Sequence, residues 1–218
     1  MEVLPMNVVR RVLIGSVCLI GATSVYASES AELRVKGIIS PAACTPSFSG
    51  IIDYGYIDPK RLNPTAETRL PEKQLSYTIN CAAPVTVATT WVDARKGTES
   101  DGHDPLLNDI VFGLGLQGSN KIGKYFVKND TSITADGQPV DTIYQLQSGG
   151  AWQNDGDRYQ IATNTIHAYA TPGTLIPGSY SSIASAVKID TYIAPTENLD
   201  MSKNVVLDGL ATMTMRYL

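Results

Sequence analysis

The stretch NVVLDGLATMTMRYL, residues 204–218, alternates between apolar and polar side chains. Its odd positions carry Val205, Leu207, Gly209, Ala211, Met213, Met215 and Tyr217. Its even positions are mostly polar, with Asp208, Thr212, Thr214 and Arg216. A period of two over this length predicts a β-strand with one face in a core. Because chain ends usually fray unless they are held, we expect this strand to have a neighbour, and another chain could supply it.

The rest of the sequence predicts many short strands separated by Gly, Pro, Asn and Asp. They cover residues 31–39, 51–57, 74–81, 84–92, 110–116, 122–128, 140–146 and 182–193, with a strand pair or one bent strand over 159–171. We find no helical periodicity over ten or more residues beyond the N-terminus. The pattern predicts an all-β fold, a sandwich or a barrel, and the absence of a repeat or linker favours one domain.

Residues 1–27 predict a signal peptide. Arg10 and Arg11 precede an apolar run over residues 12–22, which is too short to span a bilayer. Small residues at Val25 and Ala27 predict cleavage after Ala27. An uncleaved anchor is the alternative. The mature chain is expected to be exported and to contain no transmembrane segment.

Two cysteines, Cys44 and Cys81, remain after the signal peptide is removed. An even number in an oxidising compartment predicts one disulfide. A metal pair or a catalytic thiol fits less well, because there is no C-x-x-C motif and His103 and His167 lack ligand spacing. We therefore expect no metal site formed by these cysteines.

Motifs for catalysis or cofactor binding are weak. Residues 113–118 match G-x-G-x-x-G, but a strand rather than a helix is predicted to follow, so we expect no dinucleotide. No nucleophile elbow or zinc-protease motif is present, and we predict that the protein is not an enzyme and has no cofactor. The net charge of −4 argues against a nucleic-acid partner.

Two binding alternatives stay open at this point. The acidic loop that contains Glu99, Asp101 and Asp104 could hold a structural calcium ion, or it could simply be solvated. Trp91 and Trp152 could line a glycan site, although aromatic residues in strands are more often core residues. A self-complete β-sandwich that binds a glycan or a protein is therefore the alternative function.

Several stretches resemble the subunits of chaperone–usher fimbriae. The sequence is most similar to the GltF-like family, described as β-fimbriae probable major subunits and also classed as a domain of unknown function. The stretches that carry the resemblance are LRVKGIISPAACTPSFSG, IDYG, LPEKQLSYTINCAAP, FGLGLQG with IGKY, and LDGLATMTMRYL. They are spread over most of the mature chain, and their order is more specific than any one of them.

The resemblance implies a structural fimbrial subunit. Residues 37–218 would form an immunoglobulin-like, pilin-type β-sandwich that lacks its last strand. A periplasmic chaperone would lend that strand, and the N-terminal extension of a neighbouring subunit, residues 28–36, would replace it at the outer-membrane usher. The chain would pass through the periplasm to the cell surface.

The resemblance also implies which residues form the two sides of the strand exchange. The acceptor groove would include Val205, Leu207, Ala211, Met213, Met215 and Tyr217. The donor side would be Ala31, Leu33, Val35 and Gly37. It does not distinguish a shaft subunit from a tip, terminating or non-assembled one.

Overall fold

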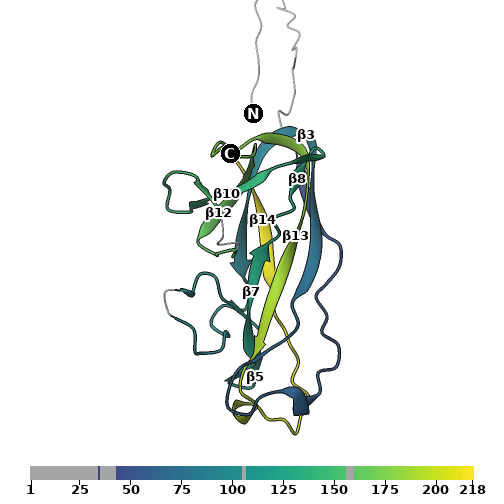
Figure 1. Cartoon of the computed structure of the whole chain (residues 1–218), viewed down its shortest axis with the longest axis vertical. Helices are drawn as coiled ribbons and strands as arrows, with labels where there is room; N and C mark the ends of the chain where they lie inside the picture. Colours follow the sequence, from purple (N-terminus) through teal and green to yellow (C-terminus); the bar gives the residue numbers. More distant parts are fainter. Residues whose placement is uncertain (1–33, 35–42, 105–106, 156–159) are drawn as a thin grey trace, which may run out of the picture. The chain divides into compact units, whose positions relative to one another are not determined.

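A computed structural model describes residue 34 and residues 43–104, 107–155 and 160–218 (Figure 1). The predicted signal peptide, the strand over 31–39 and the four donor residues therefore lie outside the described residues, apart from Arg34. Among the described residues, no helix is both long and apolar enough to cross a membrane.

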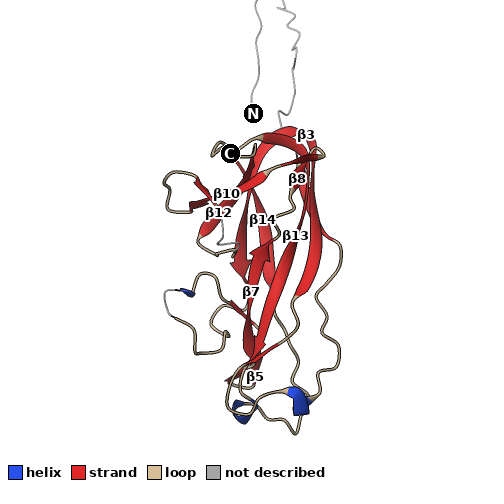
Figure 2. Cartoon of the chain, viewed as in Figure 1, coloured by secondary structure: helices blue, strands red, loops and turns tan. Residues whose placement is uncertain are grey.

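The described chain is almost entirely β-structure, as the sequence predicted (Figure 2). Two 3₁₀ turns, η1 (Pro59–Arg61) and η4 (Thr196–Asn198), are the helical elements with assigned bounds in this part. The strands are β1 (Cys44–Phe48), β2 (Thr68–Arg69), β3 (Lys73–Asp93), β4 (Phe112–Gly113), β5 (Leu116–Gln117), β6 (Asn120–Lys121), β7 (Gly123–Asn129), β8 (Thr134–Ala135), β9 (Gln138–Pro139), β10 (Asp141–Leu146), β11 (Gln153–Asn154), β12 (Thr165–Ala170), β13 (Ser179–Ile193) and β14 (Ala211–Tyr217).

The prediction of two strands over 74–81 and 84–92 was wrong, because β3 is one strand of 21 residues. Pro84 cannot donate a ladder hydrogen bond, and it was interpreted as part of a strand boundary. In the structure Pro84 lies where the register between β3 and β13 shifts, so the missing donor interrupts the pairing without ending the strand.

β3 takes part in two successive sets of strand pairs. Its first part lies between β1 and β13, with Ile79 opposite both Pro46 and Ile183. Its last part lies between β14 and β12, with Thr89 opposite both Met215 and His167. From there the antiparallel sheet continues through β7 and β4 on one side and through β10 and β11 on the other. This curled sheet is consistent with the predicted β-sandwich.

The core follows from this arrangement. A large cluster of apolar side chains includes Ile79, Trp91, Phe112, Val127 and Ile183, from β3, β4, β7 and β13. A smaller cluster gathers Ala88 of β3 with Ile143, Ile166, Ala168 and Ala170, and Trp152 packs against it.

Hairpins connect several of the short strands. Residues 110–116 and 122–128, both predicted as strands, form a hairpin in which β4 pairs with β7 and β5 pairs with β6. Asp136 and Gly137, with φ of 48° and 76°, make a tight turn between β8 and β9. The glycine motif over 113–118 lies on strands and turns, and no helix follows it in the described residues.

Two predicted strands are only partly formed. The stretch 51–57 is extended but is not assigned as a strand, and the C-terminal strand begins at Ala211 rather than at residue 204. Alternation in the sequence reports which face of an extended segment is buried, whereas a strand also needs a hydrogen-bonded neighbour.

Candidate functional site

Two extended segments without a place in the sheet border an apolar groove. The first edge segment is residues 51–57, and the second edge segment is residues 205–210. In the first, Ile52, Tyr54 and Ile57 pack against the core, while Ile51 and Tyr56 are 83% and 88% exposed. The alternation of a strand holds from Ile51 to Tyr54 and is interrupted at Gly55, whose φ is 61°.

The second edge segment repeats this arrangement. Val205 and Leu207 pack against the core, whereas Val206 is 70% exposed and Leu210 is 46% exposed. The two rims thus display large apolar side chains to solvent beside a groove that is itself apolar. Exposed apolar surface of this kind is typical of an interaction site.

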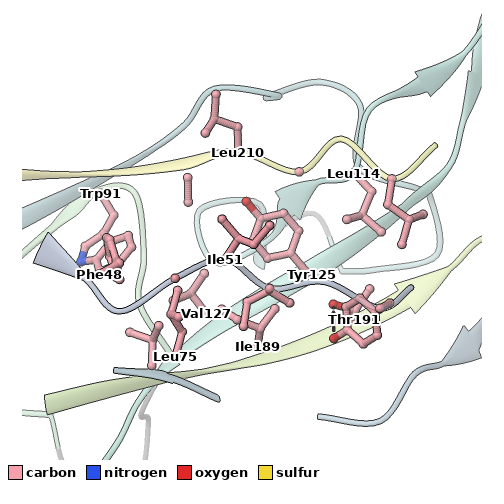
Figure 3. A pocket seen from close by; sticks show the side chains of 17 residues that line it. Phe48, Ile51, Leu75, Trp91, Leu114, Tyr125, Val127, Ile189, Thr191 and Leu210 are labelled. Atoms are coloured by element: carbon pink, nitrogen blue, oxygen red, sulfur yellow. Dashed lines mark hydrogen bonds between the residues drawn. The ribbon is translucent and has the colours of Figure 1, made fainter. Parts of the chain in front are cut away.

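The groove contains two adjoining cavities. The first, of about 340 Å³, has Leu75, Val127, Ile189 and Thr191 in its floor and both edge segments at its sides (Figure 3). At one end Phe48 lies edge-on to Trp91, with the ring centroids 6.0 Å apart. The second cavity, of about 650 Å³, continues between residues 52–57 and residues 201–207.

Backbone hydrogen bonds show why the two segments are edges. Among the described residues, no backbone hydrogen bond joins one edge segment to the other. The second is fixed on one side, since Asp208 N donates to Leu114 O (3.0 Å) and Ala94 N donates to Leu210 O (2.9 Å). The first is held by side chains: Tyr54 Oη bonds Thr191 Oγ1 (3.0 Å), and Lys73 lies over the Tyr54 ring. Backbone groups facing the groove therefore remain available for another strand.

The predicted disulfide lies at the start of β1, the strand that precedes the first edge segment. Cys44 and Cys81 are opposite each other on β1 and β3 and are bonded, which confirms the prediction. The Cys44 N–H also donates to Tyr217 Oη (2.9 Å), so the last strand is attached to the disulfide strand. This bond joins the first residue of β1 to the last residue of β14.

Charged groups hold the second edge segment in position. The Arg95 guanidinium forms a paired contact with the Asp208 carboxylate, at 2.9 and 3.0 Å, and also bonds the Asp208 carbonyl. This hydrogen bond lowers the pKa of Asp208. Burial raises the pKa of nearby Asp93, although its carboxylate accepts hydrogen bonds from the Gly113 and Arg95 N–H groups. Asp93 therefore ties the end of β3 to β4.

The six predicted acceptor residues divide into two groups. Val205, Leu207 and Ala211 line the cavities of the groove. Met213 is buried opposite Trp91 on β3, Met215 packs on the core, and Tyr217 is 41% exposed. These three do not line either cavity. They follow Ala211 on the same face of β14 and lie farther along the strand.

Sequence reasoning did not identify the first edge segment as one side of the groove. Residues 51–57 were predicted as an ordinary strand, although the alternation of IIDYGYI between two turn-rich stretches is the same signal as that in residues 204–210. Tyr125, which lies in the groove (Figure 3), was also missed because its place on β7 looks like any other aromatic core position. The pairing partners of β7 are remote in sequence and could not be read from it.

The other candidate residues have structural surroundings. His103 contacts Ser100 O and Asn108 Oδ1, and Asp101 pairs with Lys121 (2.8 Å). Within the described ranges no group of three acidic, His or Cys side chains could hold a metal ion. Trp91 is only 4% exposed, so it is not available to stack on a sugar.

The fold and the groove define a disulfide-bonded, all-β protein with an open place at the edge of its sheet. Residues 33–138 match the family model described as "Protein of unknown function (DUF1120)". The chain is also similar to protein GltF of Escherichia coli (strain K12), with 28% identity over 239 residues that cover 91% of this chain and 93% of GltF. The predicted similarity to GltF-like proteins is thereby confirmed.

Proposed function

We propose that this protein is a structural, non-enzymatic subunit of a bacterial surface fimbria that is completed by a β-strand from another chain. The single observation that carries the proposal is the groove between two extended segments that do not pair with each other. Adding a strand there would satisfy backbone groups on both sides and would cover Ile51, Val206 and Leu210. The resemblance of the sequence to fimbrial subunits supports the same conclusion.

The N-terminal extension of a second copy is the occupant that fits best. Its nine residues, 28–36, would span about 30 Å when extended, which is longer than either edge segment. Ala31, Leu33 and Val35 alternate with Glu32, Arg34 and Lys36. The apolar side chains would enter the groove, and the charged side chains between them would face solvent.

Export would require a chaperone. An exposed apolar edge is an aggregation site, and an exported subunit with such an edge needs a temporary strand before assembly. A periplasmic chaperone would supply this strand, and the outer-membrane usher would exchange it for the extension of the neighbouring subunit. The protein would then reside in the fimbrium at the cell surface.

The proposal is tested by supplying the strand. The mature chain, produced in the periplasm, is mixed with a labelled peptide that has the sequence of residues 28–39. We expect saturable binding measured by fluorescence anisotropy and a raised, sharper thermal transition. A chain that melts cooperatively as a monomer and binds no peptide would instead be a self-complete sandwich.

Two leucines offer a matched control for the site of binding. Leu207 lines the groove, whereas Leu146, on β10, is 45% exposed and lines neither cavity. Leu207→Glu should abolish peptide binding because a charge would be buried without a partner, whereas Leu146→Glu should leave it nearly unchanged. Formation of the disulfide checks that both variants fold. Equal loss in both variants would place binding elsewhere.

A further inference from the structure

The groove contains one polar group that the fold itself does not use. Tyr125, on β7, is 6% exposed and lines the first cavity, and its hydroxyl has no hydrogen-bond partner among the described residues. Figure 3 shows the ring between the two edge segments, with the hydroxyl oxygen on the side of Leu210. The hydroxyl oxygen itself is open to the groove, since the fully buried side-chain polar atoms without a partner among the described residues are Thr142 Oγ1 and His167 Nδ1. A strand that fills the groove without pairing this hydroxyl would remove its water at a desolvation cost.

The position of the Tyr125 ring is tightly defined. It packs against Phe112 at a centroid distance of 5.3 Å, and its Cε1 atom lies 2.8 Å from where a side chain on Gly209 would begin. Gly209 thus gives the ring room beside the second edge segment. Since the ring is held on these sides, its hydroxyl is directed to one place in the groove before any ligand arrives.

The chemical state of this hydroxyl makes it a donor. Burial raises the pKa of Tyr125, with a further contribution from the Asp93 carboxylate, so the phenol is neutral at any physiological pH. Tyr54 differs although it lies in the same cavity, because its hydroxyl already bonds Thr191 Oγ1. Of these two phenols, Tyr125 is therefore the one available to an incoming chain.

We propose that Tyr125 is a specificity-determining residue, whose hydroxyl donates a hydrogen bond to an acceptor atom on the strand that enters the groove. This inference rests on the proposed function and adds a polar point of recognition to an apolar site. A strand with an acceptor over Tyr125 satisfies the hydroxyl, while a strand that places an alkyl group there leaves it unpaired. The groove thus discriminates between strands of equal hydrophobicity.

The test compares Tyr125→Phe with Tyr144→Phe in the full mature chain. Tyr144, on β10, lines neither cavity, and its hydroxyl bonds Gln153, so it is the control for losing a tyrosine hydroxyl outside the groove. The probe is the labelled peptide of residues 28–39. We expect Tyr125→Phe to weaken peptide binding about tenfold and Tyr144→Phe to leave it within about twofold of the unsubstituted chain. A second set of peptides, with Ser in turn at Ala31, Leu33, Val35 and Gly37, locates the contact.

The outcomes separate the two proposals. If the unsubstituted chain binds the peptide and Tyr125→Phe binds equally well or more tightly, the role of Tyr125 is overturned and the groove remains a strand site. Equal weakening by both Phe variants would also overturn it, since the effect would then follow from packing. If the unsubstituted chain binds no peptide, the proposed function itself fails. A Ser peptide that tightens binding only when Tyr125 is present would support the inference.

Discussion

The ladder between β3 and β13 and the two edge segments are built from the same kind of sequence but differ in their partners. β13 pairs with β3 along most of its length and with β7 on its other side. Residues 51–57 and 205–210 also turn alternate apolar side chains to the same core over part of their length, yet they have no strand between them. The comparison shows that alternation selects the buried face, while hydrogen-bonded neighbours decide which segments are complete.

Removing the disulfide should give the largest loss of stability, and it should affect the first edge segment more than the β3–β13 ladder. Replacing Cys44 and Cys81 by Ser opens a loop with a sequence separation of 37, and the chain-entropy argument gives a loss of about 4 kcal/mol. The first edge segment would lose its anchor on β3, while the β3–β13 ladder itself would keep its hydrogen bonds. Urea denaturation of the double variant measures the loss. A midpoint equal to that of the unsubstituted chain would show that pairing alone holds β1.

The next largest loss of stability is expected from truncating a core side chain, and it should be larger on a fully paired strand than on an edge segment. Ile79 is fully buried opposite Ile183, so Ile79→Ala should cost about 3 kcal/mol of unfolding free energy with or without a bound strand. Ile52 lies on the first edge segment, and Ile52→Ala should cost less than about 1 kcal/mol in the empty chain and more once the peptide is bound. Denaturation curves with and without the peptide of residues 28–39 give both values. An Ile52 effect as large as that of Ile79 in the empty chain would contradict the distinction.

A smaller loss of stability should appear on lowering the pH, through a residue that does not line the groove. Burial lowers the pKa of His167 on β12 to about 4, below its ordinary value of 6.5. The folded state holds the neutral ring, so this stabilisation is complete above about pH 6.5 and is lost as the pH falls toward 4. The full shift corresponds to about 3 kcal/mol.

The pH effect can be assigned with one substitution. In His167→Gln the position does not titrate, and stability should fall less steeply between pH 6.5 and 4 than in the unsubstituted chain. Peptide binding in the groove should keep its pH dependence, because the residues that line the groove do not include His167. Stability curves from chemical denaturation at several pH values make the comparison, and parallel curves would exclude His167 as the titrating group.

Much of the candidate site could be read from the sequence. Alternation predicted that Val205, Leu207 and Ala211 share a buried face, the resemblance to fimbrial subunits placed them in a groove, and the cysteine pair followed from its number and context. Met213, Met215 and Tyr217 belong to the same alternating run but lie farther along β14 than Ala211 and line neither cavity, so the pattern alone could not separate them from the groove. The first edge segment has an equally clear pattern, but only a neighbour close in space distinguishes an edge from an ordinary strand.

The sequence by itself determined the all-β class, the single disulfide and the buried face of each extended segment, because these depend on local period and composition. The tertiary structure decided that β3 is one strand shared by two sets of partners, that residues 51–57 and 205–210 border the same groove, and that Tyr125 lies between them. These facts arise from hydrogen bonds between residues far apart in the chain. Local sequence does not encode such pairings one segment at a time, because each strand can satisfy its backbone with any neighbour of suitable register.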